Sequence, residues 1–181
     1  MRKLIVHTLV SLDGVFEDPP SWGSRDYKED ESLRDELGEV RACDAMLFGR
    51  RGYEALFPIF SQREDPWAAR INAMNKHVFS STLHDAPWQN SKLVRGDAAG
   101  AVENMKRAEG GDLLVYGYTR FSESLLRQGL VDVLRVAIYP VIAGRGCQLF
   151  REGAATRMRL VATKTYSKGV VLLTYAAQDR A

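Results

Sequence analysis

The stretch "DLLVYGYTRFSESLLRQGLVDVLRVAIYPVI" (residues 112–142) holds the pattern that decides the fold. Its first part, 112–117, is an apolar run that ends in a glycine, as a buried strand followed by a turn does. Residues 121–129 then have the pattern of a helix that Gly129 terminates, and 133–142 form another long apolar run. A strand, a helix and a second strand in succession predict a parallel βαβ unit.

The same alternation continues outward in both directions. Strands are expected at 3–10, 45–49, 76–81 and 92–95, and helices at 29–42, 53–60, 66–74 and 97–108. In the first of these helices Leu33, Leu37 and Val40 form one apolar stripe, and Asp97 suits the N-cap of the last. Residues 157–176 predict two strands joined by a Lys-Gly turn. The fold class is therefore α/β, with a mostly parallel central sheet flanked by helices and a C-terminal antiparallel hairpin.

Length and composition limit the classes of protein to consider. At 181 residues the chain is expected to form a single domain, 1–181. A hydrophobic fraction of 45% with 27% charged residues is typical of a soluble protein, and no apolar run reaches the roughly 20 residues of a membrane helix. The net charge of +2 is too small and too evenly spread to favour nucleic-acid binding. The two cysteines, Cys43 and Cys147, lack a CxxC spacing and indicate a reducing, cytoplasmic setting.

Two adjacent arginines follow one of the expected strands, in "LFGRRGYE" (47–54). A helix N-terminus already carries about half a positive charge, so arginines there are unfavourable unless an anion is bound. Gly49 allows a sharp turn, and Arg50 or Arg51 can form the two-pronged contact that suits phosphate oxygens. The stretch favours a phosphate site, and the alternative is two solvated arginines ahead of an amphipathic helix.

Two further strand ends carry small polar residues. Ser80 and Ser81 close one expected strand, and "YGYTR" places Gly117, Tyr118 and Thr119 at the start of a helix. Because ligands bind at the carboxyl ends of strands in such sheets, the three turns suit a ligand with separated phosphates, such as NADPH. Taken singly, serines after a strand are ordinary turn residues. The chain has no GxGxxG fingerprint, so an ordinary Rossmann site is not supported.

Several motifs, in chain order, resemble one known family. They are "SLDG" (11–14), "FGRRGYE" (48–54), "VFSSTL" (78–83), "GGDLLVYG" (110–117) and above all "LLRQGLVDVLRVAIYPVIAGRGCQLF" (125–150). Together they resemble the reductase domain of the riboflavin-biosynthesis deaminase–reductase, which shares the dihydrofolate reductase fold. The resemblance spans nearly the whole chain and implies a dihydrofolate reductase-like fold, NADPH as the cofactor and a homodimer.

The resemblance also implies where the cofactor binds. The Gly-Arg turn of that family holds the 2′-phosphate end of NADPH and corresponds to residues 49–51, with 80–81 beside it. The family's later glycine turn holds the pyrophosphate and corresponds to 117–119. Two positions depart from the family pattern, because Gly52 replaces the usual threonine and Tyr118 replaces a small residue. Gly52 removes a hydroxyl that would touch phosphate, and Tyr118 either caps the pyrophosphate or blocks it.

Four residues are the candidates for binding the substrate. Asp13, at the end of the first strand, is the candidate catalytic and substrate-binding carboxylate, and the alternative is a turn aspartate that bonds its own backbone. Trp22 and Tyr27, on the long loop 13–28, either stack on a flat heterocycle or pack against the body of the protein. Asp30 is placed on the inner stripe of the first helix, where dihydrofolate reductases carry the acid that pairs with the pterin. The acidic run around Asp30 equally fits a solvated helix start.

These residues predict an NADPH-dependent reductase that delivers hydride to a C=O or C=N bond of a small heterocyclic substrate, without a metal. The three histidines lack metal-ligand spacing, and neither a GxSxG elbow nor the HxE and PCxxC signature of a zinc deaminase is present. One alternative is a non-catalytic NADP-binding or sensor protein, which Gly52 and Tyr118 would favour. Another is a structural dimer in which the strand "LRVAIYPVI" (134–142) pairs across a two-fold axis.

Overall fold

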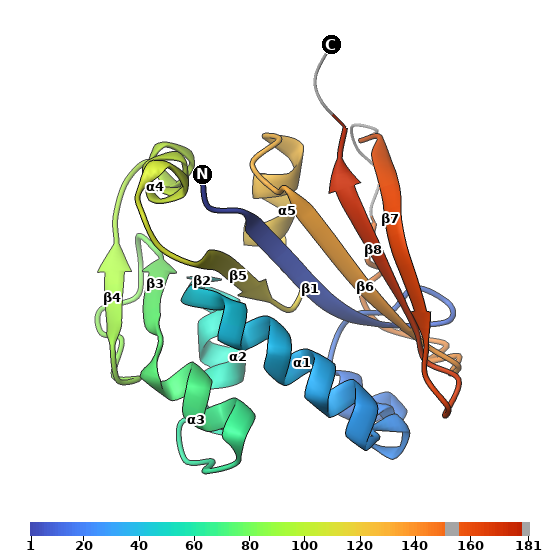
Figure 1. Ribbon diagram of the computed structural model, residues 1–181. Helices are drawn as coiled ribbons and strands as arrows, with labels where there is room; N and C mark the ends of the chain where they lie inside the picture. The colour runs from blue at the N-terminus through green and yellow to red at the C-terminus, as the bar shows by residue number, and fades with distance from the viewer. Residues whose placement is uncertain (151–155, 179–181) are drawn as a thin grey trace.

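The computed structural model describes residues 1–150 and 156–178, and its eight strands form one sheet (Figure 1). The strands are β1 (Leu4–Ser11), β2 (Cys43–Gly49), β3 (Asn75–Phe79), β4 (Ser91–Val94), β5 (Asp112–Tyr116), β6 (Val133–Tyr139), β7 (Met158–Thr165) and β8 (Val171–Ala177). Their order across the sheet is β4-β3-β2-β5-β1-β6-β8-β7. β1 to β6 pair in parallel, and β8 and β7 add an antiparallel edge. The expected α/β class, with its mostly parallel sheet and C-terminal hairpin, is confirmed.

Helices cover both faces of this sheet, as crossovers between parallel strands require. They are α1 (Asp30–Ala42), α2 (Arg50–Phe60), α3 (Pro66–Ala73), α4 (Ala98–Arg107) and α5 (Arg120–Arg127). α1, α2 and α3 share one face, here called the α1 face, whose core includes Val40, Tyr53 and Ile71. α4 and α5 lie on the other, the α5 face, with Val102 and Leu125 in its core (Figure 1). No helix in the described ranges is long and apolar enough to span a bilayer.

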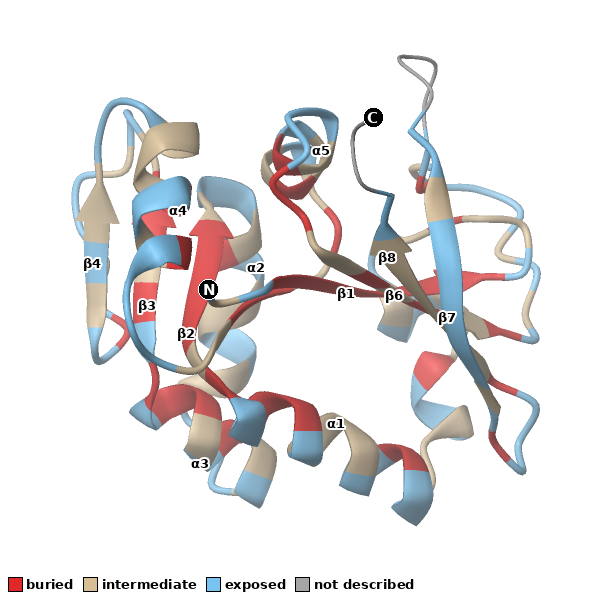
Figure 2. Cartoon of the chain, turned by 45° about the horizontal axis from the view of Figure 1, so that its top comes forward, coloured by how far each residue is buried: buried red, intermediate tan, exposed pale blue. Residues whose placement is uncertain are grey.

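β1 lies near the centre of the sheet, and its side chains alternate between the two faces. Leu4 and Val6 belong to the core of the α5 face, whereas Ile5 and Leu9 belong to cores on the α1 face. Every residue of the strand is buried, as its red colour in Figure 2 shows. His7 therefore takes an inward position on the α1 face, in the middle of an otherwise apolar strand.

The buried side of α1 follows the apolar stripe expected from the sequence only in part, since Leu37 and Val40 pack in the core of the α1 face. Leu33 is 47% exposed, and the buried residues of the helix are Ser32, Glu39 and Val40. Asp30 is exposed in the first turn, so its placement on the inner stripe is wrong. The helix turns polar side chains inward because charged side chains of β1 and β6 lie beneath it.

The long loop at 13–28 contains two short 3₁₀ helices, Pro19–Trp22 and Ser24–Tyr27. Ser24 is the only buried residue in these two helices. The segment lies beside the α1 face, where the rings of Trp22 and Tyr27 meet Tyr139 of β6. It forms a cover that few buried contacts hold in place.

β6 occupies an interior position, between β1 and β8. Its backbone pairs with both neighbours along most of its length. The expected pairing of this strand across a two-fold axis is therefore wrong, because it has no free edge. Among the described strands, β4 and β7 are the ones at the sheet edges.

Candidate functional site

Three turns meet at the carboxyl edge of the parallel strands. β2 lies between β3 and β5, so the ends of these three strands are neighbours. Gly49 pairs with Phe79 in the sheet register, which puts the start of α2 beside the turn after β3. The rings of Phe79 and Phe121 stack with centroids 4.9 Å apart, which joins that turn to the start of α5. The structure thus brings together the three strand ends that the sequence analysis placed in one site.

Gly49 is a point of close approach between β2 and α5. A Cβ atom at Gly49 would lie 2.6 Å from the Cβ of Phe121, and one at Gly52 would lie 3.5 Å from the Cγ2 of Thr119. The N-termini of α2 and α5 are therefore packed side by side. No side chain caps the first turn of α2, so the N–H groups of that turn suit an anion.

The two arginines at the start of α2 differ in their contacts, although both are exposed. Arg50 donates from Nε to Glu54 at 2.8 Å and from Nη1 to the hydroxyl of Thr82 at 2.9 Å. Its guanidinium is therefore already held by the protein. The side chain of Arg51 has no hydrogen-bond or ion-pair partner among the described residues. Arg51 is the free cation at an uncapped helix start.

A third arginine, Arg95, joins the same edge, although the sequence analysis did not single it out. It follows β4, and its guanidinium donates to the carbonyls of Ser80 and Leu83. The Ser80 hydroxyl accepts the N–H groups of Thr82 at 3.2 Å and Leu83 at 2.9 Å, so it shapes the turn, while Ser81 is exposed. Attention to every strand end would have found Arg95, because it closes one of the expected strands.

The turn after β5 combines an open backbone with a capped helix. Gly117 has a φ of +89°, in the left-handed region that favours glycine, and open space lies where its Cβ would be. Thr119 and Ser122 form a capping box at the start of α5, in which the Thr119 N–H donates to the Ser122 hydroxyl at 2.7 Å. Thr119 thus serves the helix, while Gly117 leaves room for a ligand.

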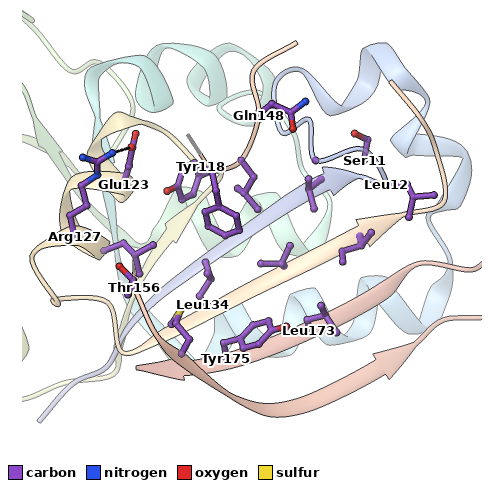
Figure 3. Close-up of a pocket in the computed structure, with 18 residues that line it drawn as sticks. Ser11, Leu12, Tyr118, Glu123, Arg127, Leu134, Gln148, Thr156, Leu173 and Tyr175 are labelled. Atoms are coloured by element: carbon purple, nitrogen blue, oxygen red, sulfur yellow. Dashed lines mark hydrogen bonds and ion pairs between the residues drawn. The ribbon is translucent and has the colours of Figure 1, made fainter. Parts of the chain in front are cut away.

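Tyr118 turns from this edge toward the α5 face. It is 6% exposed and meets Phe16 and Phe150 edge-on, with ring centroids 5.5 Å and 6.1 Å away. It lines a cavity of about 700 Å³ that lies over β6 and β8, beside α5 (Figure 3). Its ring therefore belongs to the wall of this cavity rather than to the surface around Gly49.

The large cavity is mostly apolar. Its apolar lining includes Val10, Leu126, Leu134, Val136, Ile138, Leu149 and Leu173. The α5 wall adds an ion pair between Glu123 and Arg127, 2.7 Å long (Figure 3). Leu12 and Phe150, which also line the cavity, are 63% and 61% exposed. Such a hollow suits a flat ring or an apolar surface of another subunit.

Asp13 lies at the end of β1, but its carboxylate is committed to its own chain. It accepts the Ser11 hydroxyl at 2.6 Å and the N–H groups of Ala143 at 2.9 Å and Gly144 at 2.8 Å. These bonds, that of Ser11 first, lower the pKa of Asp13 to about 2. Such a carboxylate is poorly suited to proton transfer near neutral pH. These contacts assign Asp13 to anchoring the loop after β6, and they give no support to its predicted catalytic and substrate-binding roles.

The two loop aromatics pack against the body of the protein. Trp22 and Tyr27 meet the ring of Tyr139 edge-on, with centroids 5.4 Å and 6.0 Å away, and the Trp22 Nε1 donates to the Glu17 carbonyl at 3.1 Å. Tyr27 lines a small cavity of about 20 Å³ on the α1 face. Asp30 lines neither this cavity nor the large one.

A buried charged cluster that the sequence analysis missed lies beneath α1. The Nδ1 of His7 bonds to one carboxylate oxygen of Glu39, and the Nη1 of Arg135 lies 3.1 Å from the other. His7 and Glu39 are 3% and 6% exposed, and His7 lines the small cavity. No group of three potential metal ligands occurs in the described part of the chain. The available signal was a histidine at an inward position of an apolar strand.

The charges of this cluster support one another. Burial would lower the pKa of His7, but the Glu39 carboxylate outweighs it, and the pKa lies above its usual value. Burial would raise the pKa of Glu39, but His7 and Arg135 lower it below its usual value. Burial, followed by the nearby Glu36 carboxylate, raises the pKa of Tyr116, whose ring lies 5.3 Å from that of His7. The cluster thus favours an imidazolium facing a carboxylate, beside a neutral tyrosine.

One family accounts for nearly the whole chain. A family model described as the RibD C-terminal domain matches residues 2–172. The chain is also 28% identical over 183 residues to the uncharacterized protein YyaP of Bacillus subtilis (strain 168). That match covers 96% of this chain and 94% of YyaP.

Solved structures share this architecture. A Shewanella sp. PV-4 protein, provisionally named as a riboflavin biosynthesis protein, has a TM-score of 0.75 at 19% identity over 97% of this chain and 99% of that one. A pyrimidine reductase-like protein of Corynebacterium diphtheriae has a TM-score of 0.65 at 11% identity, over 99% and 93%. The Thermotoga maritima diaminohydroxyphosphoribosylaminopyrimidine deaminase/5-amino-6-(5-phosphoribosylamino)uracil reductase has a TM-score of 0.69 at 15% identity, over 98% and 57%. At these identities the likeness establishes the fold, which is the one that the sequence motifs implied.

Proposed function

The chain belongs to the RibD C-terminal domain family, and from that premise we propose that it is an NADPH-dependent reductase of a small heterocyclic substrate. The substrate class is a pyrimidine or a pterin, and the reaction is the transfer of hydride to its C=O or C=N bond. The names of two structural relatives, a uracil-derivative reductase and a pyrimidine reductase-like protein, support this class.

The observation that carries the proposal is the pairing of two helix N-termini at one sheet edge. α2 starts without a side-chain cap, next to the free cation of Arg51, and α5 starts beside the open turn at Gly117. Positive helix ends with available N–H groups bind phosphate. The uncapped start of α2 is one such place, and the open turn at Gly117 on the adjacent strand offers a second, so the edge suits a ligand with two phosphate centres, which NADPH has and an ordinary mononucleotide lacks.

The residues at this edge fit NADPH better than NADH. Arg51 would hold the 2′-phosphate, because a guanidinium can form two parallel hydrogen bonds to phosphate oxygens. Arg50 and Ser81 lie in the same group of turns and would support that contact. The pyrophosphate would lie at Gly117, where open space and a left-handed backbone allow close approach. Thr119 would fix the helix start beside it.

NADPH, when bound, would supply the hydride, so the protein's own residues have to bind, orient and exclude water. Contacts within the protein already hold the turns proposed for binding. Gly49 packs against Phe121, and the Arg50 side chain is held by Glu54 and Thr82. A site whose parts are already fixed loses little entropy when it orders a ligand.

A calorimetric titration of cofactor-free protein with NADPH and, separately, NADH tests the proposal. We expect micromolar binding of NADPH and much weaker binding of NADH. An assay of NADPH oxidation with 5-amino-6-(5-phosphoribosylamino)uracil and with dihydrofolate then tests the substrate class. If neither cofactor binds, the proposal fails. If NADPH binds but neither compound is reduced, both named substrates are excluded.

A non-catalytic NADP-binding or sensor protein is the second candidate function. Gly52 favours it, because the first turn of α2 lacks the hydroxyl that the family usually offers to phosphate. The packing of Gly52 against Thr119 keeps the two helix ends together without that hydroxyl. Tight NADPH binding with no turnover of any heterocycle would support this candidate over the reductase.

We further propose a cytoplasmic homodimer. The large apolar cavity of the α5 face has exposed apolar side chains, Leu12 and Phe150, in its lining. A second subunit commonly covers apolar surface of this kind. Both cysteines, Cys43 and Cys147, are free thiols, which fits a reducing compartment.

A further inference from the structure

One ring nitrogen of His7 is bonded to the protein and the other is not. Nδ1 bonds to Glu39, whereas Nε2 is buried without a hydrogen-bond partner among the described residues. Leaving a buried polar atom unpaired is unfavourable, so such atoms normally meet water or a ligand. His7 therefore points to a hydrogen-bonding group from outside the chain.

The space beside His7 is the small cavity of about 20 Å³ on the α1 face. A cavity needs roughly 10 to 15 Å³ of such volume to hold one water molecule, so this one holds a single polar atom. The polar side chains that line it with His7 are Tyr27, Ser32, Glu36, Tyr139 and Tyr166. A carbonyl oxygen or an imine nitrogen matches this size and polarity.

The cavity is close to the turn proposed for the cofactor. The carbonyl of His7 accepts the N–H of Gly117 at 2.8 Å, and His7 pairs in register with Tyr116, the residue before that glycine. The rings of His7 and Tyr116 are 5.3 Å apart on the α1 face. A ligand that extends from the Gly117 turn onto this face reaches the imidazole.

Building on the proposed reductase function, we propose that His7 is the proton donor of the reduction and that the cavity receives the nitrogen or oxygen of the reducible C=N or C=O bond. The carbon of that bond receives hydride, with its electron pair, from the nicotinamide of the cofactor. The π electrons move to the nitrogen or oxygen, which takes the proton from Nε2 of His7. His7 is left as neutral imidazole with Nδ1–H bonded to Glu39, and the oxidised product is NADP⁺. Solvent returns a proton to His7 after the product leaves.

Glu39 acts through His7 and is a positioning residue. Its carboxylate accepts a hydrogen bond from Nδ1–H, which fixes the ring that lines the cavity and leaves Nε2 as the nitrogen available to a ligand. Arg135 holds the second oxygen of the same carboxylate. A carboxylate behind a histidine is the usual means of keeping an imidazolium in place.

The two 3₁₀ helices cover the small cavity from outside, and this segment is suited to moving aside. Tyr27 lines the cavity and ends the two 3₁₀ helices, in which Ser24 alone is buried. A segment with few buried contacts opens at low free-energy cost. Displacing Tyr27 would admit the rest of a heterocyclic ring while its reducible atom occupies the cavity.

Titratable and charged groups face His7 from every element around it. They are Glu36 and Glu39 of α1, Tyr116 of β5, Arg135 and Tyr139 of β6, Tyr27 of the 3₁₀ segment and Tyr166 after β7. The two carboxylates favour the imidazolium, and burial and Arg135 oppose it. The carboxylates prevail, and the pKa of His7 lies above 6.5.

Nuclear magnetic resonance of the histidine rings in the full chain tests the proposal without any substrate. His7→Gln assigns the signal, and Glu39→Gln should lower the pH at which it titrates. We expect the wild-type His7 ring to carry protons on both nitrogens at about pH 6.5 and to lose one at higher pH. A ring that is already neutral at about pH 6 overturns the proposal.

Single-turnover reduction of 5-amino-6-(5-phosphoribosylamino)uracil and of dihydrofolate by the NADPH-loaded protein supplies the second test. His7→Gln should slow the reaction about 100-fold or more while NADPH affinity is unchanged. His77→Gln, at a half-buried histidine on β3, is the matched control and should react at the wild-type rate. Equal rates for His7→Gln and wild type would remove the role of His7 and leave the reductase proposal standing. Wild-type protein that binds NADPH and reduces neither compound would remove both.

Discussion

The backbone N–H of Gly117 donates a 2.8 Å hydrogen bond to the carbonyl of His7. This bond joins the turn proposed for the pyrophosphate to the strand residue whose imidazole is buried on the α1 face. Tyr116 and Tyr118, on either side of Gly117, point to opposite faces, one toward the buried cluster and the other toward the large cavity. The turn after β5 therefore connects the proposed cofactor site with the small cavity on the α1 face and with the large cavity on the α5 face.

Replacing Arg51 with alanine should weaken NADPH binding selectively. The loss of a charge-assisted phosphate contact costs about 1 to 3 kcal/mol, roughly 5- to 150-fold in affinity, and NADH lacks the 2′-phosphate. Arg50→Ala should cost less, because Glu54 and Thr82 already hold that side chain. Calorimetry with both cofactors measures the difference, with Arg107→Ala on α4 as the exposed control. Equal losses for NADPH and NADH would show that the start of α2 does not bind the 2′-phosphate.

Replacing Gly49 with alanine should destabilise the protein by about 1 to 3 kcal/mol, as overpacking does. The new methyl would lie 2.6 Å from the Cβ of Phe121, where α5 meets β2. Gly38→Ala in α1 is the control, since open space surrounds that position and alanine should stabilise the helix by up to about 1 kcal/mol. Urea unfolding of both variants measures the two effects. Shifts of the same sign would argue against a tight contact between Gly49 of β2 and Phe121 of α5.

The ionised form of Asp13 should stabilise the fold in a defined pH range. Its pKa is about 2 in the folded protein and about 4 in an unfolded chain, so the stabilisation is present above about pH 4 and is lost as the pH falls through about 2. Asp13→Asn should lower the melting temperature at neutral pH, and its difference from wild type should shrink at acid pH. Asp30→Asn, at an exposed position, is the control. A difference that is the same at both ends of the titration would mean that the charge of Asp13 is not what holds the loop.

Most of the fold could be predicted from the sequence, because burial on both faces makes a parallel strand apolar throughout. β5 and most of β1 are such runs, whereas the order of the strands does not follow the chain, since β1 lies between β5 and β6. The polar part of the buried side of α1 could not be predicted in this way. Glu39 is buried because it pairs with His7, 32 residues away in the sequence, and with Arg135. Apolar periodicity carries no signal for a buried ion pair between distant residues.

In the candidate site too, local patterns could be predicted from the sequence and contacts between distant residues could not. Gly49 and Gly117 could be found because a strand, a glycine and a helix start form a local pattern. The contacts of Asp13 could not, since its partners at 143–144 lie about 130 residues further along the chain. For Trp22 and Tyr27 the sequence leaves open whether they stack on a ligand or pack against the protein, because their packing against Tyr139 depends on the position of β6.

If the chain forms a dimer through the α5 face, Phe150→Asp should produce monomers. The side chain is 61% exposed and lines the apolar cavity, so a charge there would be buried at the interface without a partner. Sedimentation at micromolar concentration measures the state of both proteins. Leu33→Asp, at an exposed apolar residue on α1, should leave the dimer intact. Wild-type protein that sediments only as a monomer would end the homodimer proposal.

The stability of the fold should also depend on pH through His7. Because its pKa is raised in the folded protein, the imidazolium stabilises the fold below about pH 6.5, and this contribution is lost as the pH rises through the folded value. The pKa of Glu39 is lowered, so its contribution is present above about pH 4.5 and is lost at lower pH. The pair therefore contributes most between about pH 4.5 and pH 6.5.

His7→Gln should consequently reduce the free energy of unfolding more at about pH 6 than at about pH 9, as urea titrations at several pH values can measure. His77→Gln is the matched control with the opposite sign. Burial, with Lys92 and Arg2, lowers the pKa of His77, so protonation of His77 destabilises the fold as the pH falls. A cost of His7→Gln that is smaller at about pH 6 than at about pH 9 would mean that His7 stays neutral in the folded protein, as expected for His77. An already neutral His7 has no Nε2 proton to give while Nδ1 stays bonded to Glu39, so that result would also remove the proton-donor assignment.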